Sequence, residues 1–467
     1  MYKKKIEEYI DAHRQEMLED ICLLCKINSE RSAYQEGMPY GEGPSRALMQ
    51  ALSMAENYGF SINNYDNYVG TADLNEGERR LDILAHLDVV PAGEGWTVTE
   101  PFKPLEQDGK LYGRGTADDK GPAIAALYAM RAVKELKLPV TKNVRLILGT
   151  DEECGSSDIL HYYDVEPEAP MTFSPDGAFP VVNIEKGRLP GHFTAEFEPS
   201  KAAARILSVQ GGTKVNVVPG KAFAVIEGLD DDLVRAEGET LLRETGVSFE
   251  LQGKNHTLEI TAVGEGAHAS TPQEGKNALC ALIRLLTRLP FEPCGQIAAL
   301  KQLEGLFPFE DTAGEQLGVA MEDELSGALT LAFSLLEVRE DGLEASFDIR
   351  CPICGNEENV LKPIQAKLEE HGFTLTNESM EPAHHVDGES DFVKTLLNVY
   401  ERYTGRKGSC QSMGGGTYVH SLKNGVAFGA SMPETDNRMH GADEFAVIEE
   451  LLMSAKIFAQ AIVELCK

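Results

Sequence analysis

Hydrophobic positions in the first part of the chain follow two alternating patterns. Apolar residues recur every three or four positions over three segments, which predicts helices at residues 5–27, 44–58 and 122–136. Strand-like runs lie between these segments, at residues 59–64, 67–74, 81–86 and 144–150. Buried strands that alternate with helices are typical of an α/β sheet with helices on its faces.

From about Gly187 the pattern changes, and strand-like segments outnumber helices. A first round of strands is expected near residues 189–197, 204–209, 221–227, 247–252 and 256–263. A helix is expected near 276–289, and a second round of two strands and a helix follows near 328–337, 343–350 and 357–371. This order is typical of an α+β domain.

After about residue 380 the α/β pattern returns. It comprises a helix near 390–403, a strand near 426–429 and a long helix from about Glu444. We therefore predict an α/β domain, with a mixed sheet flanked by helices, and an α+β domain inserted into it. The first is built from residues 1–186 and 383–467, and the second from 187–382. An insertion of roughly 190 residues is long enough for two α+β units.

The charge and the cysteines limit the possible partners and locations. A formal net charge of −32 argues against nucleic acid and anionic membranes as partners. No apolar segment approaches the roughly 18 residues of a membrane span, and the N-terminus lacks the apolar core of a signal peptide. Nine cysteines without a signal favour reduced thiols in the cytoplasm. The C-x-x-C pairs Cys22/Cys25 and Cys351/Cys354 are interpreted as packing residues.

A glycine-rich loop, Gly113–Gly121, lies between a predicted strand and a predicted helix. Glycine permits close backbone approach or a positive φ. A phosphate cradle would need Lys followed by Ser or Thr, or a third glycine where Asp118 stands, and the Asp118 carboxylate would repel phosphate. The loop is therefore interpreted as one that holds Asp118 rigidly against cations.

Further polar residues of ligand type stand at the ends of the α/β strands, where ligands collect in such sheets. They are His86, Glu152, Glu153, Asp176 after a short apolar strand, and His440 before the last helix. Asp88, two residues after His86, can hold the second nitrogen of that imidazole. Carboxylates gathered in this way repel one another unless a cation neutralises them, so the pattern predicts a metal centre.

The order of these motifs resembles the two-metal metallopeptidase family of aminoacylase, glutamate carboxypeptidase and related deacylases, over essentially the whole chain. Asp119 after the bridging position, the run Gly414–Tyr418 and the long insertion are most similar to the PepV-type bacterial dipeptidases. The resemblance implies an α/β catalytic domain with an inserted α+β lid domain. It also implies metal-dependent hydrolysis of dipeptides that have free N- and C-termini.

The resemblance assigns a role to each motif residue. Asp118 is similar to the carboxylate that bridges both ions, His86 and Asp176 to the other ligands of one ion, and Glu153 and His440 to those of the second. Glu152 matches the general base, which moves a proton from a water activated by the two ions. Asp88 is counted with the catalytic residues, and His268 matches the lid histidine that stabilises the developing oxyanion.

The resemblance also implies a set of substrate-binding residues: Asn216, Arg350, Gly414, Gly415, Gly416 and Thr417. An arginine binds a carboxylate through two parallel hydrogen bonds, and exposed N–H groups of a glycine loop add donors, so the C-terminal carboxylate of a dipeptide is the expected ligand. His420 is a departure, because close relatives are expected to carry Arg there. The identity of the preferred dipeptide stays open.

Two divalent ions are the expected cofactors, with Zn²⁺ first and Mn²⁺ or Co²⁺ also compatible with one His and carboxylates per ion. The alternative activities are an amidohydrolase of N-acyl amino acids and a small carboxypeptidase of the same family. A metal-binding or regulatory protein without catalysis is also conceivable, but loss of Glu152 or a ligand would then be expected. We further expect a monomer in which His268 acts within its own chain, because the second half of the long insertion could take the place of a partner's lid.

Overall fold

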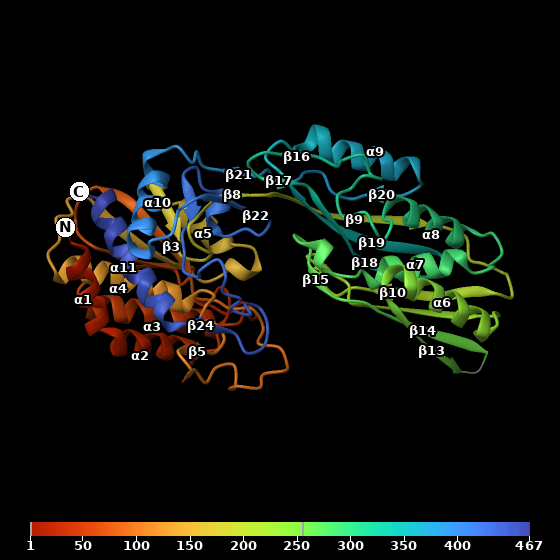
Figure 1. Cartoon of the computed structure of the whole chain (residues 1–467), viewed down its shortest axis with the longest axis horizontal. Coiled ribbons are helices and arrows are strands. Elements are labelled where there is room, and N and C mark those ends of the chain that lie inside the picture. The colour runs from red at the N-terminus through yellow and green to blue at the C-terminus, as the bar shows by residue number, and fades with distance from the viewer. Residues whose placement is uncertain (1, 255) are drawn as a thin grey trace. The chain divides into compact units, whose positions relative to one another are not determined.

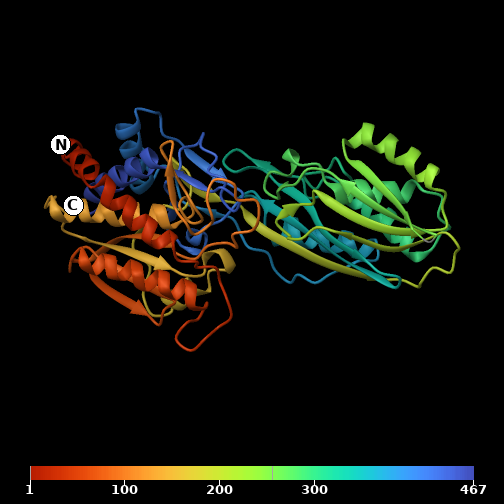
Figure 2. The same ribbon diagram turned by 90° about the horizontal axis from the view of Figure 1, so that it is seen from below.

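The computed structural model describes residues 2–254 and 256–467 and divides into two compact units. The first unit contains residues 1–184, 385–411 and 416–467, and the second contains 185–384 and 412–415. Both chain termini lie in the first unit (Figures 1 and 2). The sequence placed the insertion at 187–382, whereas the contacts also assign the short segment Ser412–Gly415 to the second unit.

The first unit is built on a mixed sheet. The order of its strands is β1 (Ser61–Tyr65), β2 (Val69–Asp73), β6 (Asn143–Gly149), β3 (Arg79–His86), β7 (Met171–Ser174), β23 (Gly425–Ala427), β8 (Val181–Glu185) and β21 (His384–His385), with β22 (Cys410–Met413) beside β8. The pairs β3–β6, β3–β7 and β7–β23 are parallel, and β1–β2 and β2–β6 are antiparallel.

Both faces of this sheet are covered, which explains the apolar runs in its sequence. In β3, Ile83 and Ala85 face the larger core, whereas Leu84 faces a smaller core that includes Tyr418. Because successive side chains of a strand point to opposite faces, a strand buried on both sides is apolar at nearly every position.

The larger core is formed by helices from both ends of the chain. They are α1 (Lys3–Ala12), α2 (Arg14–Cys25), α3 (Glu42–Asn57), α4 (Lys120–Glu135), α10 (Asp391–Thr404) and α11 (Ile448–Leu465). Helices α4 and α11 pack against each other (Figure 1). The smaller core packs under α5 (Ser157–Tyr163) and the 3₁₀ turn η4 (Tyr418–Ser421). A separate three-stranded sheet joins β24 (Phe445–Val447), β5 (Lys110–Tyr112) and β4 (Leu105–Gln107).

The second unit is built on a single eight-stranded sheet. The order of its strands is β13 (Ser248–Lys254), β14 (Thr257–Val263), β12 (Lys221–Glu227), β10 (Arg205–Gly211), β18 (Thr330–Val338), β19 (Gly342–Cys351), β9 (Gly187–Glu196) and β20 (Thr374–Leu375). Helices α6 (Asp231–Thr245), α7 (Ala278–Arg288), α8 (Gly295–Leu306) and α9 (Lys362–Glu370) share one core with it (Figure 1). The two predicted α+β halves therefore share one sheet: β10 of the first half pairs with β18, and β9, also expected in the first half, pairs with β19 of the second.

Several predicted boundaries change in the structure. The helix expected over residues 5–27 is two helices that break at His13. Helices α6 and α8 were not predicted. The last helix begins at Ile448 rather than near Glu444, because Phe445–Val447 first pair with β5 as strand β24.

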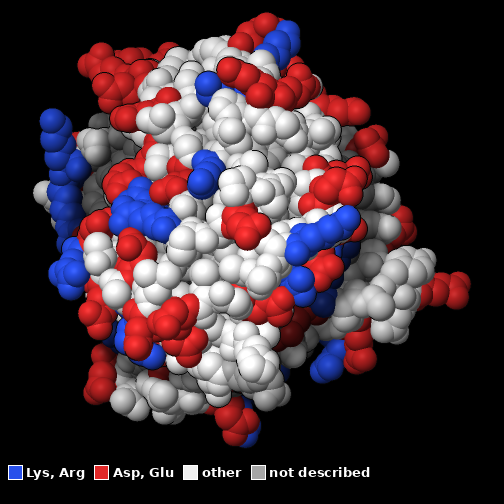
Figure 3. Space-filling view, turned by 90° about the vertical axis from the view of Figure 1, so that its right-hand side faces the viewer, with Lys and Arg blue, Asp and Glu red and all other residues white. Residues whose placement is uncertain are grey.

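Acidic side chains are prominent on the surface (Figure 3), as expected from the net charge of −32. On the face drawn in Figure 3, acidic side chains are dispersed among basic and uncharged ones rather than gathered in one patch. Among the described residues, no helix is both long and apolar enough to cross a membrane.

One carboxylate in the core of the first unit is buried without well-formed hydrogen bonds to other described residues. Asp82, in β3, has no solvent exposure, and neither of its carboxylate oxygens makes a well-formed hydrogen bond within the described residues. Arg79 Nε lies 3.6 Å from Asp82 Oδ1. Burial raises the pKa of Asp82 to about 7, although Arg79 and Arg145 oppose the shift. Above that pH the fold therefore carries a desolvated charge.

We predict that Asp82→Asn stabilises the protein at pH 8 and has little effect at or below pH 4. The folded state holds the Asp82 proton up to about pH 7, whereas the unfolded chain releases it near pH 4, so the wild type loses about 1.4 kcal/mol per pH unit across that window. The variant has no such loss. Thermal melts of both proteins at several pH values measure the difference, and a variant that is less stable at pH 8 would contradict this account.

Candidate active site

Loops and turns of the first unit bring the predicted ligand residues together. His86 is the last residue of β3, and Asp176 follows β7 by two residues. Glu152 and Glu153 form the 3₁₀ turn η1 (Glu152–Cys154) two residues after the end of β6. The remaining two residues are on loops, with Asp118 just before α4 and His440 before β24.

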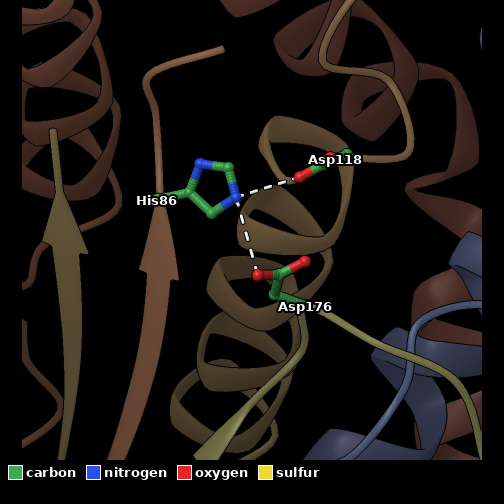
Figure 4. Close-up of side chains that lie close together, drawn as sticks. All are labelled: His86, Asp118 and Asp176. Atoms are coloured by element: carbon green, nitrogen blue, oxygen red, sulfur yellow. Dashed lines mark hydrogen bonds and ion pairs between the residues drawn. The ribbon is translucent and has the colours of Figure 1, made fainter. Parts of the chain in front are cut away.

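Asp118 lies between two histidines. Its Oδ1 is 3.0 Å from His86 Nε2, and its Oδ2 is 2.9 Å from His440 Nε2. Asp176 Oδ2 lies 3.6 Å from the same nitrogen of His86, and these three side chains point toward one another (Figure 4). Glu153 Oε2 lies 3.3 Å from His440 Nε2. The residues thus form two groups, His86–Asp118–Asp176 and Asp118–Glu153–His440, whose donor atoms lie within 4.8 Å of one another.

Buried carboxylates of the two groups, and the neighbouring Glu152, have raised pKa values. Burial and the charge of Asp118 raise the pKa of Asp176 to about 7 and also raise that of Glu153. Burial raises the pKa of Glu152 well above its ordinary value. Hydrogen bonds to Asp118 and Glu153 raise the pKa of His440 to about 11. A cation between the same atoms would neutralise these buried carboxylates.

The donor set fits divalent metal ions. Each group offers one imidazole nitrogen and carboxylate oxygens, a combination that suits Zn²⁺ and also Mn²⁺ or Co²⁺. Glu153 Oε1 is buried and has no hydrogen-bond partner among the described residues. A buried carboxylate oxygen without a partner is costly, and a metal ion would satisfy it.

Asp88 supports the site differently from the sequence-based expectation. The predicted partner of His86 Nδ1 was the Asp88 carboxylate, but this nitrogen lies 3.1 Å from the Asp88 backbone oxygen and 3.5 Å from Oδ1. The carboxylate instead accepts hydrogen bonds from the backbone N–H groups of Glu152 and Glu153, each at 3.1 Å. Asp88 therefore holds the turn that carries both glutamates.

Asp119 is a supporting residue that the sequence reasoning used only as a family marker. Its Oδ2 accepts a hydrogen bond from the backbone N–H of His86 at 3.1 Å, and the side chain is fully buried. Asp119 thereby connects the end of β3 to the loop that carries Asp118. The adjacent carboxylates could be seen in the sequence, but their different roles could not: Asp118 faces the imidazoles of His86 and His440, whereas Asp119 binds the backbone of His86.

The comparisons with known proteins agree with this geometry. The model of "Peptidase family M20/M25/M40" matches residues 83–464. The Beta-Ala-Xaa dipeptidase of Lactobacillus delbrueckii subsp. lactis is 34% identical over 465 residues, which cover 99% of this chain and 98% of that protein. The chain belongs to the M20/M25/M40 peptidase family. It is accordingly a hydrolase of peptide bonds.

Two solved structures share the fold of this M20 chain. Human carnosine dipeptidase 1 has a TM-score of 0.62 at 16% identity, and 100% of this chain and 99% of that one are covered. Aminoacylhistidine dipeptidase from Vibrio alginolyticus has a TM-score of 0.59 at 14% identity, with 97% and 96% covered. They support the predicted α/β catalytic domain with an inserted lid domain, which are the first and second units described above.

The second unit of the M20 chain carries His268 on a short strand and Asn216 in the turn just before the neighbouring strand. β11 (Val217–Val218) pairs with β15 (Ala267–His268), and Val217 is opposite His268. The Asn216 backbone oxygen accepts a hydrogen bond from Ala269 N at 2.9 Å. The backbone N–H of Ser270 donates to His268 Nδ1 at 3.2 Å, and Ser270 Oγ lies 2.6 Å from the same nitrogen. Ser270 therefore orients the exposed imidazole through its Nδ1 atom.

Arg350, in β19, is buried among partners of its own unit. Its guanidinium donates to both carboxylate oxygens of Asp348, at 2.6 and 2.9 Å, and to the Gly414 backbone oxygen at 2.6 Å. Asp348 was missed by the sequence reasoning, although its spacing of two residues on a strand places both side chains on one face. Gly414 and Gly415 belong to the second unit and Gly416 and Thr417 to the first, while Thr417 caps η4 by accepting from Val419 N.

We predict that Asp88→Asn weakens the turn that carries Glu152 and Glu153. Asn retains one acceptor oxygen, so one of the two backbone N–H groups loses its partner, at a cost of about 1–3 kcal/mol. We expect at least tenfold lower kcat and a lower Tm of the metal-free protein. Steady-state kinetics and thermal melts measure both, and a variant with wild-type kcat would show that the turn does not need the second acceptor.

Proposed function

We propose that this M20 peptidase is a dinuclear metal-dependent dipeptidase acting on dipeptides with free N- and C-termini. The observation that carries the proposal is the position of Asp118, whose two oxygens each face a histidine that has a carboxylate of its own. The name of the 34% identical relative, a Beta-Ala-Xaa dipeptidase, supports a dipeptide substrate.

The residues of the two groups would hold one ion each. His86 and Asp176 would bind the first, Glu153 and His440 the second, and Asp118 would bind both. When bound, two divalent ions supply Lewis acidity to the scissile carbonyl and to a water. The chain's own contribution is to fix these donors on strand ends and on turns with buried hydrogen bonds, so that the donors need no rearrangement.

Glu152 is the proposed general base. Its neighbour Glu153 lies 3.3 Å from His440 in the second group, whereas Glu152 belongs to neither group. A carboxylate beside the ligands can take a proton from the attacking water and give it to the leaving amine. Asp88 keeps both glutamates in place through their backbone N–H groups.

His268 and Arg350 are the proposed substrate contacts of the second unit. Ser270 holds Nδ1 of His268, and a proton on Nε2 would let this imidazole donate to an oxyanion. The guanidinium of Arg350 is held in plane by Asp348, and one of its N–H groups is directed to Gly414 in the glycine segment. Together with Asn216 and the Gly414–Thr417 loop, it is proposed to bind the C-terminal carboxylate of the dipeptide.

A second candidate activity is hydrolysis of N-acyl amino acids, or removal of a C-terminal residue by a small carboxypeptidase of the same family. Both use the same metal centre and the same carboxylate-binding residues. They differ from a dipeptidase because their substrates need no free α-amine. The comparison of Ala-Ala with N-acetyl-Ala below separates the dipeptidase from these alternatives.

We predict that Glu152→Gln lowers kcat at least about 100-fold while two ions stay bound, because a general base can be lost without losing a ligand. Metal analysis of the purified variant and steady-state assays with Ala-Ala measure the two effects. Glu153→Gln is the matched control, since it should lose metal as well as activity. If Glu153→Gln were instead inactive with full metal content, the two roles would be reversed.

We predict that amidation of the C-terminus of Ala-Ala lowers kcat/KM at least tenfold, or about 1.4 kcal/mol, because one charged contact is lost. In Arg350→Lys this discrimination should shrink, because an ammonium group cannot form the two parallel hydrogen bonds. N-acetyl-Ala should be a poor substrate. Equal rates on the dipeptide and its amide would remove Arg350 from the proposal, and fast hydrolysis of N-acetyl-Ala would favour the amidohydrolase.

A further inference from the structure

A buried carboxylate joins the two loops that carry Asp118 and His440. Glu444 has no solvent exposure. Its Oε1 accepts hydrogen bonds from three backbone N–H groups of the glycine-rich loop: Gly115 at 3.0 Å, Ala117 at 3.0 Å and Asp118 at 3.3 Å. Its own backbone oxygen accepts from Gly113 N at 2.9 Å. Most of the Gly113–Asp118 backbone is therefore held by this single residue.

The other oxygen of the same carboxylate is neutralised by Arg114. Arg114 Nη1 donates to Glu444 Oε2 at 2.6 Å, and the guanidinium is 1% exposed. Arg114 Nη2 donates to backbone oxygens of Pro91, Ala92 and Gly441 at 3.1–3.4 Å. The buried charge is thus paired and hydrogen-bonded, which is the condition under which a buried ion pair is tolerated.

The loop that carries His440 is fixed at both ends. Asn437 Nδ2 donates to the backbone oxygen of Phe445 at 2.8 Å, and Phe445 N donates back to the Asn437 oxygen at 3.1 Å. Asp443 accepts from the backbone N–H groups of Thr97 and Val98 at 2.8 and 2.9 Å. His440 itself has φ +63°, a conformation that a non-glycine residue keeps only where its surroundings demand it.

We propose that Glu444 is a positioning residue that sets the separation between the Asp118 carboxylate and the His440 imidazole. It stands four residues after His440 and binds the backbone of Asp118 itself, so a shift of its carboxylate displaces both ligands relative to each other. The inference rests on the proposed metal centre and extends it by one residue that touches neither substrate nor ion.

The chemistry of the contacts explains why a carboxylate is needed here. Three N–H donors and one guanidinium converge on Glu444, and a carboxylate offers two acceptor oxygens and no donor. A glutamine beside Arg114 would turn an amide NH₂ toward the guanidinium or toward the backbone N–H groups. An aspartate keeps the charge, but it is one methylene too short to reach both loops from the same backbone position.

Two variants separate the positioning role from the charge. Glu444→Asp preserves the charge and withdraws the oxygens, whereas Arg114→Met/Glu444→Gln removes the charge pair and keeps an acceptor for the N–H groups. Glu450→Gln is the matched control. Glu450 also stands near the start of α11 and accepts from a backbone N–H group, that of Met432 at 3.0 Å, but the 432–435 segment that it holds carries no metal-ligating residue.

The measurements are thermal melts of the metal-free proteins, binding isotherms for Zn²⁺ against a chelator, and the visible spectrum of the Co²⁺-loaded proteins. We expect Glu444→Asp to bind at least one of the two ions about 10- to 100-fold more weakly, with an altered Co²⁺ spectrum. The double variant should recover most of the affinity, and Glu450→Gln should match the wild type.

A wild-type isotherm and Co²⁺ spectrum in Glu444→Asp would overturn this inference while leaving the metal centre intact. Collapse of the metal-free fold in both Glu444 variants would also overturn it, because the carboxylate would then serve the fold rather than the centre. A wild-type protein that binds fewer than two ions would overturn both the proposed function and this inference, and it would be detected before any variant is made.

Discussion

The electrostatics of one aspartate organise the first unit. Asp118 is buried and lies within hydrogen-bond distance of two imidazoles, and burial together with the charge of this aspartate raises the pKa values of Asp176 and Glu153. Bringing these groups together is unfavourable without positive charge. The strands, turns and buried hydrogen bonds around them therefore do more than support a fold, because they keep mutually repelling donors close enough to share a cation.

The sheet of the first unit could be predicted because it is buried on both faces, so its strands are nearly continuous apolar runs, such as Leu81–Ala85, which only Asp82 interrupts. The helices of the second unit were harder. In α6 the large apolar residues that face the core are only Val234 and Leu241, and Gly238 lies between them, so the apolar stripe is too thin to stand out. Its N-cap, Asp230, accepts hydrogen bonds from Asp232 N and Leu233 N. This aspartate was the feature of the sequence that could have indicated the start of the helix.

The residue types of the candidate site are visible in the sequence, because each stands at the end of a strand or in a glycine-rich loop. The hydrogen bonds that orient them are not visible. The Asp88 carboxylate was expected to hold His86; its Oδ1 lies 3.5 Å from His86 Nδ1, but its closer contacts are to the backbone of Glu152 and Glu153. Such pairings depend on how far each strand extends and on which backbone N–H groups are left without partners, and neither can be read from spacing along the chain.

Burial of an unsatisfied carboxylate is not by itself the mark of a metal site, and the first unit contains both cases. Asp82 and Glu153 each have a buried oxygen without a hydrogen-bond partner among the described residues. Around Asp82 the nearby charged side chains include the cation Arg79, and no second metal-type ligand joins it in a described cluster. Around Glu153, a histidine and a further carboxylate converge within 4.8 Å. A cation site is therefore recognised by several metal-ligating side chains around one point. A single buried carboxylate such as Asp82 only destabilises the core.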